Sequence, residues 1–216
     1  MSRTTRWTVA VLIVVAALVV ALSMELRDSD SEQSATPGVG SQGVARDHRD
    51  ADTAEALAEP RAKARLEPCP PAGVGDGPQA LRGITLPCAG DGTPVDVDKT
   101  LAGRATVLNL WAYWCGPCAD ELPAMAEYQR REGDRVTVLT VHQDENEAAG
   151  LLRLAELGVR LPTLQDGRRL IAAALRVPNV MPATVVLRSD GTVAEVLPRS
   201  FVTADEIAAA VNSGIT

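Results

Sequence analysis

The chain has 216 residues, which is enough for one ordinary domain with extensions. It carries 21 basic and 28 acidic side chains, a formal net charge of −7, and because Arg3 and Arg6 lie at the start, residues 25–216 reach −9. This acidic balance argues against a nucleic-acid-binding protein, which normally presents a basic face.

Residues 1–24 have the composition of an export signal. Arg3 and Arg6 precede an apolar run from Val9 to Leu22, and residues 7–24 contain no charge. This length is at the lower limit for a membrane-spanning helix, and a basic flank before an apolar core stays in the cytoplasm. We expect an N-terminal hydrophobic helix, either a retained single-pass anchor in the cell membrane or a signal peptide cleaved near Ala21-Leu-Ser23. Either outcome places the remaining chain outside the cytoplasm, attached to the membrane or secreted.

Residues 25–66 are predicted to be a flexible tether. The stretch from Asp28 to Gly43 is rich in Ser, Asp, Gln and Gly and has few core-forming residues. Residues 47–65 contain more Ala, Glu and Arg, which is compatible with short helical turns interrupted at Pro60.

Residues 67–216 are predicted to form one α/β domain. Buried strands are expected at 105–111 and 135–141, each an apolar run, with a helix between them ending near Arg130. Asp144 and Glu147 have the spacing of a capping box for a helix ending at Gly158, and a short helix is expected at 168–175. Strands at 183–188 and 192–197 flank a Ser-Asp-Gly turn, and a second capping box at Thr203 and Glu206 starts a helix to Val211. This order predicts a mixed sheet flanked by helices.

The stretch "VLNLWAYWCGPCADELP" carries the most specific signal. A buried strand runs into Trp114-Cys115-Gly-Pro-Cys118 at the start of a helix, and Met181-Pro182 stands before the hairpin. This pattern resembles thioredoxin, and Leu101-x-Gly-Arg104, Glu121-Leu-Pro123 and Met181-Pro182-Ala-Thr184 resemble the TlpA/ResA branch of membrane-tethered thioredoxin-like proteins. The resemblance covers residues 84–212. It implies a thioredoxin-like fold, no cofactor, and a cis Met181–Pro182 peptide facing the two cysteines.

Cys115 and Cys118 are the candidate catalytic residues. Cys115 is expected just before the first helical turn, where free N–H groups and the helix dipole favour a thiolate, the attacking species in disulfide exchange. Cys118 lies one turn further and is placed to resolve a mixed disulfide. The alternatives are half of a zinc site, which requires two more ligands, or an inert disulfide. We assign no metal.

Three other positions are interpreted as parts of the site. The resemblance makes Trp114, Met181 and Pro182 candidate substrate-binding residues; the alternative for Pro182 is an ordinary trans proline starting a strand. Thioredoxin has a buried Asp where this chain has Asn109, so Glu121 is a candidate proton relay or, alternatively, a solvated first-turn glutamate. His142 is interpreted as a strand-end residue without a catalytic role.

Cys69 and Cys88 lie in Pro/Gly-rich stretches before the thioredoxin-like core. Exported chains oxidise such pairs, so a structural disulfide between them is predicted; a second redox pair is the alternative. The resulting hypothesis is an extracytoplasmic thiol–disulfide oxidoreductase that reduces exported protein disulfides, for instance in cytochrome c maturation, with electrons from a membrane donor. Its rivals are an oxidant of exported thiols and a thioredoxin-fold module that binds a metal or a partner protein.

Overall fold

The computed structural model describes residues 53–215. The predicted export segment at residues 1–24 and most of the predicted tether lie outside the described residues. The chain divides into two units at Arg46/Asp47, and the described residues belong to the second. Within residues 53–215, none of the helices is long and apolar enough to cross a bilayer.

The described part of the chain contains both strands and helices. The strands are β1 (Thr85–Pro87), β2 (Pro94–Asp96), β3 (Thr106–Trp111), β4 (Thr137–His142), β5 (Thr163–Gln165), β6 (Ala183–Leu187) and β7 (Val193–Leu197). The helices are α2 (Ala54–Ala64), α3 (Val97–Leu101), α4 (Gly116–Glu132), α5 (Glu147–Leu157), α6 (Leu170–Ala174) and α7 (Ala204–Ile215), with 3₁₀ turns η2 (Gln79–Leu81) and η3 (Gly133–Arg135).

The main sheet has the order β5-β4-β3-β6-β7 in this part of the chain. β3 runs parallel to β4, and β4 to β5, whereas β6 is antiparallel to both β3 and β7. The carboxyl ends of β3, β4, β5 and β7 therefore meet the start of β6 at one edge of the sheet. β3 is central and all six of its residues are buried, as its apolar run predicts.

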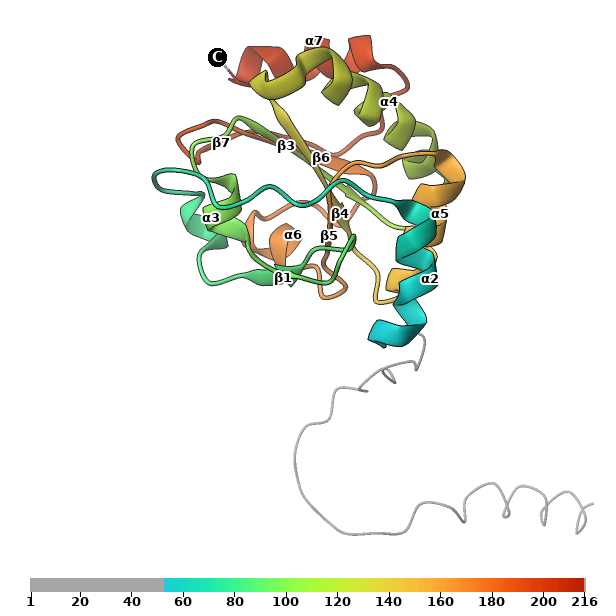
Figure 1. Cartoon of the computed structure of the whole chain (residues 1–216). Helices are drawn as coiled ribbons and strands as arrows, with labels where there is room; N and C mark the ends of the chain where they lie inside the picture. Colours follow the sequence, from blue (N-terminus) through green and yellow to red (C-terminus); the bar gives the residue numbers. More distant parts are fainter. Residues whose placement is uncertain (1–52, 216) are drawn as a thin grey trace, which may run out of the picture. The chain divides into compact units, whose positions relative to one another are not determined.

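Helices lie on both faces of the main sheet (Figure 1), and an apolar layer lies beneath them on each face. One layer contains Leu122 and Met125 of α4 with Ile207 and Val211 of α7. The other layer lies beneath α3, α6 and the short β1–β2 hairpin, whose side chains pack on alternate residues of β3, β4 and β6. The predicted mixed sheet flanked by helices is therefore confirmed.

Helix α2 corrects the predicted tether. Residues 54–64 form one continuous helix with Pro60 inside it, rather than turns interrupted at Pro60. Leu57 and Ala64 pack against Leu151 of α5, so the helix belongs to the folded unit. A proline removes a single helical hydrogen bond, and packing of the apolar face outweighs that local loss.

The first predicted capping box, at Asp144 and Glu147, is wrong for helix α5. Asn146, not Asp144, is the N-cap, and its side chain accepts a hydrogen bond from the N–H of Ala149 at 3.1 Å. The predicted end at Gly158 is confirmed by its left-handed φ of 66°.

Several short elements lie where no element was expected. Strands β1, β2 and β5 have three residues each, and helix α3 has five, which is too short for periodicity to reveal.

The second predicted capping site is confirmed, since the side chain of Thr203 accepts a hydrogen bond from the N–H of Glu206 at 3.2 Å. Helix α7 continues to Ile215, beyond the expected end at Val211.

Candidate functional site

Cys115 and Cys118 are joined by a disulfide where β3 leads into α4. Cys115 is the N-cap of α4, and its sulfur accepts a hydrogen bond from the N–H of Cys118 at 3.3 Å. Gly116 and Pro117 occupy the first two helical positions, where the missing N–H of a proline costs nothing. Both cysteines are buried, at 5% and 0% exposure.

This placement explains why the reduced pair would be reactive. The N–H groups of the first helical turn have no partner within the helix, and the helix dipole is positive at that end. Negative charge on a Cys115 sulfur would therefore be stabilised after reduction, whereas Cys118 lies within the helix and below the surface.

The Met181–Pro182 peptide bond is cis, as the resemblance implies. Pro182 is buried and directly precedes β6, which pairs with β3. Met181 is half-buried and packs against the apolar cluster that includes both Cys115 and Cys118. The fold thus brings the two parts of the motif, far apart in sequence, to the same edge of the sheet.

Trp114 is the most exposed aromatic residue beside the disulfide, at 58%. Its indole N–H donates to the Asp144 carboxylate at 3.0 Å. Asp144 therefore orients the Trp114 ring instead of capping α5. Sequence reasoning missed this role because Asp144 has the spacing of a helix cap.

Glu121 lies in α4, one turn after Cys118, and is fully buried. Its carboxylate accepts hydrogen bonds from the Asn109 amide at 2.7 Å and from the N–H of Phe201 at 3.0 Å. Burial raises the pKa of the Glu121 carboxyl to about 7, while these two hydrogen bonds act in the opposite direction. The reading of Glu121 as a solvated first-turn glutamate is wrong, because the side chain is directed into the core.

His142 is buried at the end of β4, at 1% exposure. Its ring lies 4.8 Å from that of Trp111, and its Nδ1 is 2.8 Å from the side-chain oxygen of Gln165. A Cβ on Gly150 would meet the imidazole ring, so this glycine in α5 makes room for it. These contacts make His142 part of the packing under the site.

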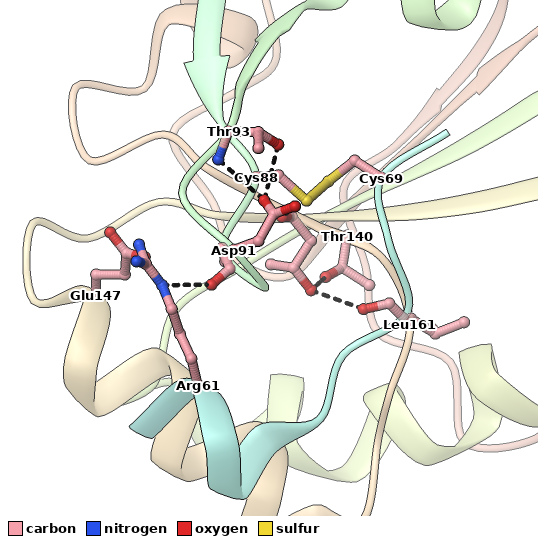
Figure 2. The surroundings of a disulfide bond; sticks show 10 residues. Arg61, Cys69, Cys88, Asp91, Thr93, Thr140, Glu147 and Leu161 are labelled. Carbon is pink, nitrogen blue, oxygen red and sulfur yellow. Dashed lines mark hydrogen bonds and ion pairs between the residues drawn. A yellow bond between two sulfur atoms is a disulfide. The ribbon is translucent and has the colours of Figure 1, made fainter. Parts of the chain in front are cut away.

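Cys69 and Cys88 form the second disulfide, which confirms the predicted pairing (Figure 2). Cys88 is buried and makes an antiparallel β-bridge with Leu164 of the outer strand β5. The disulfide therefore joins the segment after α2 to the β5 side of the sheet. Arg61 of α2 reaches the same region: it donates to the carbonyl of Ala89 at 3.1 Å and pairs with Glu147 at 2.9 Å.

The two disulfides account for all four cysteines of the sequence. Among residues 53–215, no three His, Cys, Asp or Glu side chains are grouped as metal ligands would be.

Comparisons with known proteins agree with this geometry. The family model described as "AhpC/TSA family" matches residues 79–196. The thiol-disulfide oxidoreductase ResA of Bacillus subtilis is 31% identical over 98 residues, covering 45% of this chain and 54% of ResA. A thioredoxin of Rhodospirillum rubrum is 41% identical over 75 residues, covering 33% of this chain and 68% of that protein. The match thus spans about half the length of the ResA relatives.

A solved structure resembles the fold as well. A secreted Mycobacterium tuberculosis disulfide oxidoreductase, described as homologous to Escherichia coli DsbE, superposes with a TM-score of 0.54 at 25% identity. The superposition covers 62% of this chain and 98% of that structure.

Proposed function

Because the chain belongs to the AhpC/TSA family and is ResA/TlpA-like, with a thioredoxin fold, we propose that it is a thiol–disulfide oxidoreductase with Cys115 and Cys118 as its redox pair. The observation that carries this proposal is the position of Cys115 at the N-cap of α4, with Cys118 bonded to it one turn further along.

The reaction begins with the reduced pair. The Cys115 thiolate attacks one sulfur of a substrate disulfide, so that a Cys115–substrate disulfide forms and the other substrate sulfur leaves as a thiolate, which takes up a proton. The N–H groups at the start of α4 stabilise the charge on Cys115 before the attack.

The second step releases the substrate. Cys118 loses its proton and attacks Cys115, which restores the Cys115–Cys118 disulfide and expels the second substrate thiolate. Two electrons have then passed from the protein to the substrate, and a donor must return them. Glu121 is the proposed acceptor of the Cys118 proton, since a carboxyl with a pKa of about 7 can take up and release protons near neutral pH.

Trp114, Met181 and Pro182 are the proposed substrate contacts. Trp114 offers an exposed apolar ring next to Cys115, and the Met181–Pro182 segment approaches the disulfide from the start of β6. An extended substrate segment lying between these residues would bring its disulfide to Cys115.

The proposed location is outside the cytoplasm, supported by the composition of residues 1–24 and by the secreted M. tuberculosis relative. We propose that the chain reduces disulfides of exported proteins, apocytochrome c among them, with a membrane protein as its electron donor. The resemblance of the motifs around Cys115 and Cys118 to the TlpA/ResA branch favours this direction of electron flow. Cys69–Cys88 is assigned a structural role, since Cys88 is buried against β5.

Reduction of insulin by the full-length chain tests the enzyme proposal, with dithiothreitol as donor. The wild type should accelerate precipitation of the insulin B chain, whereas Cys115→Ser should not. A chain that carries stoichiometric metal and leaves insulin intact would instead indicate a binding module.

The reduction potential tests the direction. A value near that of thioredoxin, about −270 mV, is expected of a reductant, whereas a value near about −120 mV is typical of an oxidant of exported thiols. Equilibration with glutathione buffers and alkylation of the thiols measures it.

A further inference from the structure

Residues 143–144, directly after β4, connect the loop that carries Cys115 to the loop that carries Met181–Pro182. The side chain of Asp144 accepts a hydrogen bond from Trp114, beside Cys115, and the side chain of Gln143 accepts one from Arg169. Gln143 is itself fixed to β3, because its N–H donates to the carbonyl of Trp111 at 2.8 Å.

The first connection runs from Asp144 to the Cys115 loop. One carboxylate oxygen of Asp144 accepts from the Trp114 indole, and the other accepts from the N–H of Asn146 at 2.9 Å. The backbone carbonyl of Asp144 accepts from the Gln165 amide at 2.6 Å. Asp144 is thus held from three sides and fixes the ring next to Cys115.

The second connection runs from Gln143 through Arg169 to the Met181–Pro182 loop. The Nε of Arg169 donates to the side-chain oxygen of Gln143 at 3.3 Å. A terminal nitrogen of the same guanidinium donates to the side-chain oxygen of Asn179 at 2.5 Å. Asn179 precedes Val180, which is 46% exposed, and Met181.

The backbone of Arg169 is held in an unusual conformation. Its φ of 57° lies in the left-handed region, which side-chain-bearing residues rarely adopt. Its N–H donates to the carbonyl of Asp166, whose carboxylate accepts from the N–H groups of Leu170 and Ile171 at 2.8 and 2.9 Å. Hydrogen bonds to the buried Asp166 therefore fix the backbone from which the Arg169 side chain leaves.

We infer that Arg169 is a positioning residue that holds the Met181–Pro182 loop at a fixed place relative to Trp114 and Cys115, and thereby sets the affinity for an extended protein substrate. The inference rests on the proposed function. A lysine cannot replace this arginine, since the planar guanidinium directs separate N–H groups to two acceptors.

Steady-state kinetics with two disulfides of different size test this role in the full-length chain. Insulin requires an extended segment to bind, whereas 5,5′-dithiobis(2-nitrobenzoate) presents only a small disulfide. Arg169→Ala, Arg169→Lys and Asn179→Ala should each lower kcat/KM for insulin about five-fold more than for the small disulfide, chiefly through KM. Arg168→Ala, an exposed neighbour, should behave as the wild type.

The double variant Arg169→Ala/Asn179→Ala sharpens the test. Because both substitutions remove the same hydrogen bond, the double variant should lose no more than the worse single variant. Equal losses on insulin and on the small disulfide, or fully additive losses, would overturn the inference.

Hydrogen exchange separates this inference from the proposed function. Amide exchange of residues 179–181 should quicken in Arg169→Ala and not in Arg168→Ala, whether or not the chain reduces insulin. Unchanged exchange in Arg169→Ala would refute the positioning role. Absence of insulin reduction by the wild type would instead refute the proposed function.

Discussion

Glu121 is a buried carboxyl group whose two hydrogen-bond donors, Asn109 and Phe201, are both uncharged. With a pKa raised from 4.5 to about 7, the folded protein retains a proton on Glu121 that the unfolded chain releases in this range. The contribution of this proton to the free energy of unfolding is fully present below pH 4.5 and is lost as the pH rises through about 7.

Glu121→Gln should remove this pH dependence. Between pH 4.5 and pH 8 the free energy of unfolding of the variant, relative to wild type, should rise by up to about 3 kcal/mol. Urea unfolding at the two pH values measures the change. Glu127→Gln is the control in the same helix: hydrogen bonding to Arg131 lowers the pKa of Glu127, so its variant should show no such rise. Parallel curves for wild type and Glu121→Gln would contradict this account.

The reduced protein should contain one cysteine that is alkylated faster than the others. Cys115 stands at the start of α4, which favours its thiolate, whereas Cys69 is more exposed but does not cap a helix, and Cys118 and Cys88 are at 0% exposure. Limited iodoacetamide treatment followed by peptide mass spectrometry should find the label on Cys115 first, and Cys115→Ser should lose the fast phase. First labelling of Cys118 or Cys88 would mean that Cys115 is not the nucleophile.

Arg61 attaches helix α2 to the domain. Its ion pair with Glu147 has side chains at 18% and 10% exposure, and it also donates to Ala89. Arg61→Met should therefore cost about 2 kcal/mol in the free energy of unfolding. Lys63→Met removes the exposed pair with Glu59 on the same helix and should leave the free energy of unfolding nearly unchanged, because solvent screens such a pair. Urea unfolding compares them, and equal losses would show that α2 does not depend on Arg61.

The elements that sequence predicts well are those with a dense local signal. The apolar run of β3, the left-handed Gly158 and the Thr203 cap each act through neighbouring residues. Sequence predicts only short turns interrupted at Pro60, because proline is a local breaker; the continuous helix α2 is held by packing against α5, about ninety residues further along the chain.

The candidate site divides in the same way. Cys115, Cys118 and the cis Met181–Pro182 bond follow from motifs that can be read in the chain. The contacts of Asp144, Arg169 and Asn179 depend on how separate loops meet at the sheet edge. A polar residue in a loop carries no local sign of the partner it will reach, so these contacts required the structure.

The two disulfides occupy different positions in the fold. Cys115–Cys118 closes a separation of three residues at the end of β3, and Cys69–Cys88 closes one of 19 residues beside β5. Cys69→Ser/Cys88→Ser should lose about 3 kcal/mol of stability, since the unfolded chain regains the freedom of that loop. Its insulin reduction, measured where it is folded, should match that of the wild type. Loss of activity in the folded double variant would indicate a relay through four thiols.

The central claim is that Cys115 attacks the substrate and Cys118 releases it. The most direct measurement is made on full-length Cys118→Ser, reduced and mixed with insulin, then separated without reductant and mapped by mass spectrometry. We expect a stable disulfide between Cys115 and an insulin chain, no multiple turnover, and release of that chain by dithiothreitol. Full multiple-turnover reduction of insulin by Cys118→Ser, or an insulin chain bonded to Cys69 or Cys88, would contradict it.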